Sequence, residues 1–300
     1  MLQLKTAGYI ALDNLRSRKS FPPVWQDMTE LEKSTDELIS LFREERFNVS
    51  KELGGGYLIE EVIDRFVRTD DREFMDDSRI PEQERLESVK ALERQNAFLQ
   101  LYPRHIDILL PLIRQASERF RREVKILELA SGSGGLALAL ASELKRKKFP
   151  ARITGSDIVP SYIEKSNRRA AGQNLPVEFM ELNAFDMKRL GRDEFDIIVT
   201  SQSLHHFSPG QLAVMIAQAG QHATTAFIGI DGYRSALLGL GVPFVAGLQA
   251  IPSFALDGLI SARKFYSELE LAIIAETAAG QHHYEVDCLW PLSVLTVRFD

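Results

Sequence analysis

The chain has 300 residues, 45% of them hydrophobic and 26% charged, enough to build one large or two modest domains around a full core. The net charge of −6 argues against a general nucleic-acid-binding protein, which needs a basic surface. The single cysteine, Cys288, excludes an internal disulfide and a paired-cysteine metal site, and residues 1–19 lack the apolar stretch of a signal peptide. We therefore expect a cytoplasmic protein.

The first 120 residues are expected to be helical. Apolar residues at helical spacing predict amphipathic helices over 28–47 and 56–68 and longer helices over 81–101 and 103–120. The segment before about residue 70 carries no motif that indicates a function. Two interpretations of it stay open: a helical cap over the rest of the chain, and a contact between two copies of the chain in a homodimer.

A strand, a glycine-rich loop and a helix follow one another from Lys125 onward. The letters KILELA predict a buried strand, SGSGG interrupts it at residues 131–135, and an apolar helix is predicted over 136–148. Glycines at such a turn let a ligand approach bare backbone, and the helix N-terminus offers unpaired N–H groups. The pattern is typical of nucleotide-like ligand sites in doubly wound α/β sheets, although an ordinary tight turn can have the same composition.

Four more strands alternate with helices. The strands are predicted over 151–157, 177–182, 195–201 and 225–231, and the helices between them over 160–171 and 209–222. The second strand ends in Asp157, where dinucleotide-binding folds place the acid that binds ribose hydroxyls, although this side chain could instead cap the next helix. The alternation predicts a parallel sheet with helices on both faces.

An uncharged segment follows the fifth strand. Residues 235–256 carry no charge, as a membrane span would, but Pro243, Pro252 and three glycines disfavour a straight spanning helix. We expect an apolar lid and no stable membrane insertion, with a pair of core helices as the alternative.

The end of the chain predicts one helix and two strands. Ser267 and Glu270 have the spacing of a capping box, which marks a helix start. Residues 284–290 and 293–299 alternate as two final strands, so the sheet is expected to have seven strands.

Four motifs in this order, LELASGSGG, GSD, LNAFD and FDIIVTSQSLHHF, resemble a class I S-adenosylmethionine-dependent methyltransferase over roughly residues 92–300. The resemblance implies a doubly wound, mostly parallel, Rossmann-like α/β sheet with an antiparallel last strand, and S-adenosyl-L-methionine as the cofactor. It implies that residues 1–120 form a helical region covering the cofactor and the acceptor. Residues 121–300 would form the cofactor-binding domain, with the lid inserted at 235–260.

The resemblance also implies ten cofactor-binding residues, all near the carboxyl ends of the first four strands. Those around the methionine end are Glu128, Ala130, Gly132 and Gly134. Those at the ribose and the adenine are Asp157, Ile158, Asn183 and Ala184, with Asp157 on the ribose. Those beside the sulfonium are Ser201 and Gln202.

Two of these positions depart from the family pattern. The family usually has glycine where Ala130 stands and often aspartate where Asn183 stands. We expect Ala130 to have negative φ and to leave the site open, because it adds only a methyl group. The Asn183 amide can both donate and accept at the adenine. The dinucleotide fingerprint is a poorer match, because it would need a glycine at Ala137.

His205 and His206 follow the fourth strand, at the edge of the sheet where sites form. Methyl transfer mainly needs alignment, but a phenol or enol acceptor also loses a proton, so either histidine is a candidate general base. The alternative is that one histidine packs under the sheet and the other is solvated. No metal is expected, because no cluster of histidines and carboxylates has ligand spacing along the sequence.

Together these features favour an enzyme that methylates a small, hydroxylated acceptor, apolar or aromatic because an apolar lid suits such a ligand. One alternative is a protein or RNA methyltransferase, which would need a basic or peptide-binding face. Another is a module that binds S-adenosylmethionine without catalysis. We expect a small-molecule partner and no nucleic acid.

Overall fold

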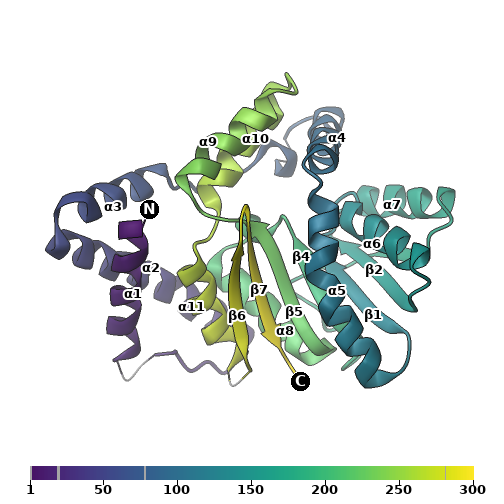
Figure 1. Cartoon of the computed structure of the whole chain (residues 1–300), viewed down its shortest axis with the longest axis horizontal. Coiled ribbons are helices and arrows are strands. Elements are labelled where there is room, and N and C mark those ends of the chain that lie inside the picture. The colour runs from purple at the N-terminus through teal and green to yellow at the C-terminus, as the bar shows by residue number, and fades with distance from the viewer. Residues whose placement is uncertain (1, 19–20, 78, 281) are drawn as a thin grey trace.

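The computed structural model describes residues 2–18, 21–77, 79–280 and 282–300, and it is built on one seven-stranded sheet (Figure 1). The strand order is β3-β2-β1-β4-β5-β7-β6. Strands β1 to β5 run parallel, and β7 lies antiparallel between β5 and β6. The predicted Rossmann-like sheet with an antiparallel last strand is confirmed.

The elements lie close to their predicted positions. The strands are β1 (Val124–Leu129), β2 (Ala151–Asp157), β3 (Val177–Glu181), β4 (Phe195–Ser201), β5 (Ala223–Gly232), β6 (Tyr284–Leu289) and β7 (Leu292–Arg298). The helices before β1 are α1 (Leu2–Arg16), α2 (Met28–Leu53), α3 (Gly55–Val67), η1 (Phe74–Asp76), α4 (Glu82–Phe98) and α5 (Leu101–Phe120). The later helices are α6 (Gly135–Arg146), α7 (Pro160–Gly172), η2 (Leu204–His206), α8 (Pro209–His222), α9 (Ala236–Gly247), α10 (Pro252–Lys264) and α11 (Glu268–Ala279).

Some element ends differ from the prediction. Helix α2 runs beyond residue 47 to Leu53, so that Gly54 alone separates it from α3. Gly54 has φ +65°, which a glycine adopts without steric cost, and this allows one residue to join the two helices. The predicted capping box is present: Ser267 accepts a hydrogen bond from the backbone N–H of Glu270, whose side chain accepts in return.

Both faces of the sheet are covered, because successive strand residues point to opposite sides. On β4, Ile197 packs into the core beneath α5 and α6, and its neighbour Ile198 packs into the core beneath α8 and α11. Both side chains are fully buried. This explains why the strand is apolar throughout, as expected for a parallel sheet buried on both faces.

The helices α1 and α2 belong to the same core as the sheet. Leu12 of α1 and Phe42 of α2 lie in one buried cluster with Leu212 of α8 and Ile273 of α11. In Figure 1 the helices α1 to α3 stand to the left of the sheet, whereas α4 stands above it, near α9 and α10. The two halves of the N-terminal region therefore occupy different places, and α4 is the part near the upper edge of the sheet.

A buried arginine joins these helices to the segment that follows β5. The Arg234 Nε donates to Asp64 Oδ1 at 2.7 Å, and Asp64 Oδ2 also accepts from Arg46 at 2.7 Å. The Arg234 Nη1 donates to the carbonyl oxygens of Arg263 at 2.8 Å and Phe265 at 3.1 Å. We call these contacts the Arg234 clasp, because they hold both ends of residues 235–264 together.

Helices α9 and α10 form a hairpin at the top of Figure 1. Ser235 caps α9 by accepting a hydrogen bond from the backbone N–H of Leu238 at 3.1 Å. Large side chains of α9 are exposed, namely Leu237, Leu240 and Phe244, and so is Leu248 at its C-cap. Within the described ranges, no helix is both long enough and apolar enough to cross a membrane.

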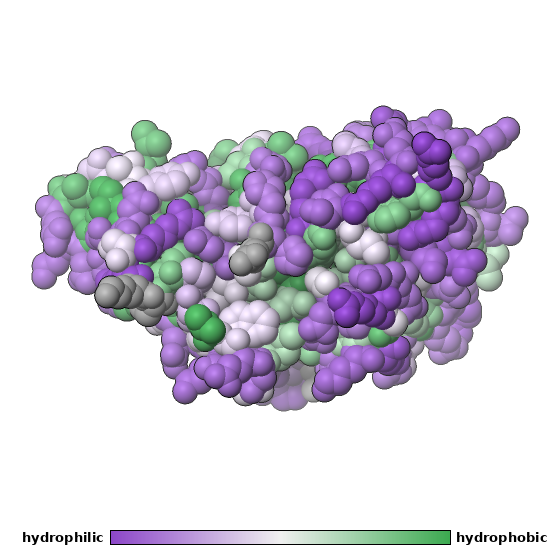
Figure 2. Space-filling view, turned by 90° about the horizontal axis from the view of Figure 1, so that it is seen from below, coloured by the Kyte–Doolittle hydropathy of each residue, from purple (hydrophilic) through white to green (hydrophobic). Residues whose placement is uncertain are grey.

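The opposite face, seen in Figure 2, is hydrophilic over much of its area, with hydrophobic side chains in smaller groups. One such group lies at the left edge, the side of the molecule where α3 is placed. Helix α3 exposes Ile59, Val62, Ile63 and Phe66. It buries Glu61 and Asp64, which pair with Arg46 of α2, so buried ion pairs help to attach α3 to the molecule.

Candidate active site

The loop between β1 and α6 turns sharply through three residues with positive φ. The angles are +50° at Ala130, +52° at Gly132 and +75° at Gly134. The prediction of negative φ for Ala130 is wrong, because the strand-to-helix turn imposes the left-handed conformation there. Such a conformation costs a residue with a β-carbon roughly 1–2 kcal/mol. The usual glycine of the family at this position therefore has a conformational reason.

The glycines of this loop have different surroundings. A β-carbon built on Gly132 would have no heavy atom within 4 Å, so there is open space beside the backbone. A β-carbon on Gly134 would clash with the Phe179 ring, and one on Gly135 would clash with the Tyr102 hydroxyl of α5. Gly132 thus leaves room for a ligand, whereas the next two glycines allow close packing at the start of α6.

Asp157, at the end of β2, fastens the loop to the second strand. Its Oδ2 accepts a hydrogen bond from the backbone N–H of Gly132 at 2.8 Å, and its Oδ1 accepts from Val159 at 3.0 Å. The Val159 contact precedes α7, which begins at Pro160, so the acid also organises the start of that helix. The structure therefore shows both the loop contact and a local contact next to the helix.

Glu128, near the end of β1, is a fully buried carboxyl group beneath the same loop. Its Oε2 accepts from the backbone N–H of Ala137 at 3.0 Å, and its Oε1 accepts from the Ser201 hydroxyl at 3.4 Å. Burial, aided by the charge of Asp157, raises the pKa of Glu128 to about 8 despite these hydrogen bonds. A cationic ligand group would be favoured here, because it would compensate the buried carboxylate.

The other predicted cofactor residues lie along the same edge of the sheet, since β3, β2, β1 and β4 are neighbours. Ile158 follows Asp157 and is 60% exposed, which suits a side chain that covers a ligand ring. Asn183 follows β3, where its Oδ1 accepts from the backbone N–H of Phe185 at 3.0 Å, with Ala184 between them. The structure thus gathers the predicted residues at one edge, with Asn183 and Ala184 at its β3 end.

Unsatisfied polar atoms mark the same edge. Among the described residues, the buried Ser131 Oγ and Gln202 Nε2 have no hydrogen-bond partner. The Gln202 Oε1 accepts from the Asn96 Nδ2 of α4 at 2.9 Å, and the Asn96 Oδ1 is also buried without a partner. Buried polar groups are normally satisfied, so these atoms fit a polar ligand such as the expected cofactor.

A cavity of about 150 Å³ adjoins this edge and shares Gln202 and Asn96 with it. Most of its lining is apolar and comes from α4, α9, α10 and neighbouring segments, including Leu92, Leu99, Leu238, Val242, Phe254 and Phe265. Its polar lining includes Glu73, His205, His206 and Asp231. Helix α4 and the segment 235–260, which we predicted to be a lid, therefore form walls of one cavity beside the edge of the sheet that carries the predicted cofactor residues, here called the cofactor edge.

His205 is buried between two carboxylates. Its Nδ1 lies 2.7 Å from Asp231 Oδ2, which also accepts from its backbone N–H at 2.9 Å. Its Nε2 lies 3.3 Å from Glu73 Oε1. Burial opposes a charge on this ring, but Asp231 and Glu73 raise the pKa of His205 to about 10. The expectation of a free general base therefore does not suit His205, because both ring nitrogens already face carboxylates.

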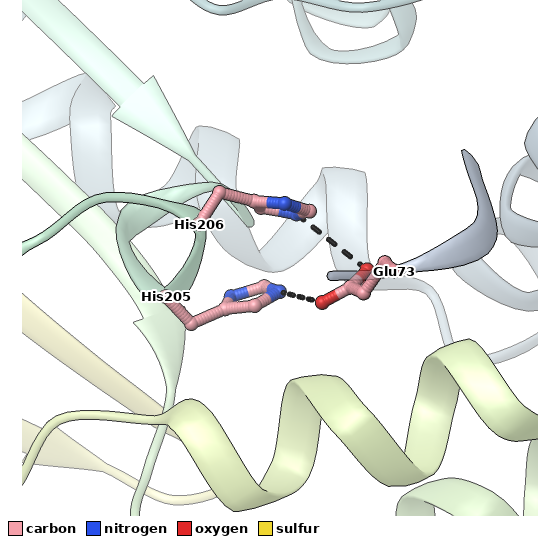
Figure 3. A group of neighbouring side chains, drawn as sticks. All are labelled: Glu73, His205 and His206. Atoms are coloured by element: carbon pink, nitrogen blue, oxygen red, sulfur yellow. Dashed lines mark ion pairs between the residues drawn. The ribbon is translucent and has the colours of Figure 1, made fainter. Parts of the chain in front are cut away.

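His206 lies beside His205 and shares the same glutamate (Figure 3). The two imidazole centroids are 4.3 Å apart, and His206 Nε2 lies 3.7 Å from Glu73 Oε2. The His206 side chain is partly exposed, unlike that of His205. Of the two predicted histidines, His206 is therefore the one that an acceptor could reach more easily.

Sequence reasoning missed four residues of this site. Asp231 ends the buried strand β5, and an acid at the end of a strand is the same signal that identified Asp157. Glu73 precedes a short 3-10 turn and carried no signal. Asn96 and Tyr102 come from the N-terminal helices and reach the cofactor edge only through the tertiary fold. The structure also brings Glu73, His205 and His206 close enough together to ligate one metal ion, a grouping that their spacing along the sequence did not indicate.

Comparisons with known proteins agree with this geometry. Residues 126–225 match the family model described as a methyltransferase domain. The chain is 32% identical over 78 residues to an uncharacterized protein of Mycobacterium tuberculosis, covering 26% of each chain. It is 31% identical over 105 residues to the release factor glutamine methyltransferase of Haemophilus influenzae, covering 34% of each. The chain thus matches only about a quarter to a third of the length of these curated relatives.

Among solved structures, the plantazolicin methyltransferase in complex with a triazolic desmethylPZN analog and SAH has a similar fold. The similarity covers 71% of this chain and 91% of that one, with a TM-score of 0.52 and 14% sequence identity. Residues 126–225 thus match a methyltransferase domain, and the chain has the fold of a methyltransferase structure that contains SAH.

Proposed function

We propose that this chain transfers a methyl group from S-adenosylmethionine to a hydroxyl oxygen of a small, apolar or aromatic molecule. The observation that carries the proposal is the cavity beside the cofactor edge, with apolar walls and a polar group of histidines and acids at one side. Such a cavity would bury the body of an apolar acceptor and orient one polar atom of it.

The residues at the sheet edge suit the cofactor. Glu128 would compensate the ammonium group of the methionine end, and the open backbone at Gly132 leaves room for it. Asp157 would bind the ribose, with Ile158, Asn183 and Ala184 at the adenine. Ser201 and Gln202 would lie beside the sulfonium. When bound, S-adenosylmethionine supplies an electrophilic methyl group.

The residues that line the cavity would bind and orient the acceptor. Side chains of α4, α9 and α10 exclude water and hold the acceptor against the cofactor edge, and such alignment is worth up to about 7–11 kcal/mol in model reactions. The polar group formed by Glu73, His205 and His206 would contact the acceptor hydroxyl. A hydroxyl held there would lose its proton more easily, which makes its oxygen a better nucleophile.

One relative, the release factor glutamine methyltransferase, is named for action on a protein, so a protein acceptor is the second candidate. The size and walls of the cavity support a small molecule instead, because a side chain of a folded protein would have to pass α9 and α10. A module without catalysis would bind the cofactor and methylate nothing.

A cofactor titration followed by an acceptor screen tests these alternatives. Calorimetry with S-adenosylmethionine should show one site, and labelled methyl transfer should appear with phenols or other hydroxylated aromatic molecules. Transfer only to protein or RNA fractions would overturn the small-molecule proposal. Cofactor binding without any transfer would support the module.

A further inference from the structure

We propose that Glu73, His205 and His206 bind one divalent transition-metal ion in the wall of the acceptor cavity. The ligands would be the Glu73 carboxylate and the Nε2 atoms of both histidines. This inference rests on the proposed function only in the use it gives the ion, which is to hold an oxygen of the acceptor. Binding of the ion itself can be tested without any acceptor.

The geometry is close to that of ligands around one ion. The candidate ligand atoms of the three residues lie within 4.8 Å of one another. The separations are 3.3 Å between His205 Nε2 and Glu73 Oε1, and 3.7 Å between His206 Nε2 and Glu73 Oε2. Ligands at about 2.0–2.2 Å from an ion, in tetrahedral or octahedral arrangement, are roughly 3.0–3.5 Å apart. Figure 3 shows both imidazoles directed toward the carboxylate from the same side.

Residues around the three candidate ligands hold the ligands in place, as is usual at metal sites. Metal-ligating histidines usually donate the second ring N–H to a carboxylate, which fixes the tautomer. Asp231 Oδ2 lies 2.7 Å from His205 Nδ1, which leaves Nε2 directed toward Glu73. The Ser261 hydroxyl donates to Glu73 Oε1 at 2.8 Å, and the Phe265 ring packs edge-on against the His205 imidazole. Asp231 comes from β5, whereas Ser261 and Phe265 come from α10 and its C-cap, and each contact fixes the position of a ligand.

The charges of the cluster also suit a divalent cation. Glu73 and Asp231 are both buried, at 1% and 5% exposure, and face the same imidazole. Buried carboxylates need compensating charge, and a divalent ion that replaces the proton on His205 Nε2 would compensate both of them. Two imidazoles and one carboxylate suit zinc, cobalt, iron(II), manganese or nickel rather than calcium, which prefers oxygen ligands alone.

The ion would leave coordination positions open toward the cavity, because three candidate ligands surround its place among the residues that the structure describes. All three line the cavity, together with Asp231. An acceptor oxygen entering an open position would be polarised, which lowers the pKa of its hydroxyl. The acceptor would then be a molecule whose methylated oxygen, or an oxygen next to it, can ligate a metal.

A cobalt titration tests the site. The full chain, treated with a chelator and dialysed, is titrated with Co²⁺ while visible absorption is recorded. We expect one equivalent to bind with d–d bands of a nitrogen- and oxygen-ligated ion. The substitutions Glu73→Gln and His206→Ala should each weaken this binding at least tenfold. Because the His206 side chain is partly exposed to solvent, His206→Ala should disturb folding less than Glu73→Gln.

The chain offers a matched control in His283 and Glu285, an exposed pair with His283 Nε2 at 3.1 Å from Glu285 Oε1. The variants His283→Ala and Glu285→Gln should bind Co²⁺ like the wild type. Absence of stoichiometric binding up to 100-fold excess of Co²⁺, or unchanged binding in both site variants, would overturn the metal site. Calorimetry with S-adenosylmethionine on the same samples separates the outcomes: normal cofactor binding without cobalt binding refutes only the metal, and no cofactor binding refutes the proposed function.

Discussion

Asp157 Oδ2 accepts the backbone N–H of Gly132 at 2.8 Å, so the acid that should bind the cofactor ribose also holds the loop that should bind the methionine end. The two parts of the cofactor site are thus connected in the structure. A change at either residue is expected to affect both parts.

Replacing Asp157 with alanine should weaken binding of S-adenosylmethionine by roughly 1–3 kcal/mol, because it removes hydrogen bonds from a charged group and releases the loop. Asp157→Asn keeps an oxygen that can accept from Gly132 and should lose less affinity. Isothermal calorimetry on both variants measures the difference. Unchanged affinity in Asp157→Ala would show that this acid is not at the cofactor.

Gly132→Val should abolish most cofactor affinity, because a branched side chain would fill the open space beside the loop. The residue also has φ +52°, so the valine adds backbone strain. Gly280→Val is the matched control, since Gly280 has φ +61° and open space but ends α11. Both variants should lose similar stability in thermal unfolding, and only Gly132→Val should lose cofactor binding. Equal affinities for the cofactor in the two variants would exclude the loop as the site.

Glu128 should make the cofactor-free protein less stable as the pH rises. Its pKa is raised from 4.5 to about 8 in the folded chain, so the unfolded chain loses the proton first. Stability is therefore lost between about pH 4.5 and 8 and levels off above this range. Glu128→Gln removes this loss.

Thermal unfolding of wild type and Glu128→Gln at pH 5 and pH 8 measures the effect. From pH 5 to pH 8, the free energy of unfolding of the variant should rise relative to that of the wild type by at least about 1 kcal/mol. This corresponds to a relative shift in melting temperature of roughly 2–4 °C for a domain of this kind. The same melting-temperature difference at both pH values would contradict a raised pKa at Glu128.

His206→Ala should lower turnover by about 10²–10⁴ while changing cofactor affinity little, because the histidine lies in the acceptor cavity. The loss should be smaller for more acidic acceptors, since these ionise with less help. His283→Ala is the exposed control. Rates close to wild type on the least acidic acceptor would mean that alignment alone drives the reaction and that His206 is structural.

The hairpin of α9 and α10 should exchange backbone hydrogens quickly in the free protein and more slowly with cofactor and acceptor bound. Helix α9 buries only Ala246 and exposes Leu237, Leu240 and Phe244, and lids belong to the less stable parts of a fold. Helix α11, which is mostly buried, serves as the slow reference. Exchange as slow in α9 as in α11 without ligand would identify a fixed core element instead.

The fold was predictable because the strands are short runs of apolar or alternating apolar and polar residues, and because residues that break strands and helices separate them. The buried strand β4 and the loop at Gly132 could both be predicted from these patterns. The positive φ of Ala130 could not be predicted, because alanine prefers negative φ and only the surrounding turn forces it positive. Glu73 was not predictable either, because its approach to His205 depends on the packing of segments far apart in the sequence.

The Arg234 clasp limits how the hairpin can move. Arg234 directly precedes residues 235–264, and its guanidinium donates to the carbonyl oxygens of Arg263 and Phe265 at the end of that segment. Both ends of the segment are therefore held at one point. We expect the hairpin of α9 and α10 to move as one body about this point, with both helices intact. The same guanidinium also donates to Asp64 of α3, so we expect that loosening α3 would also loosen the hairpin that we propose as a lid.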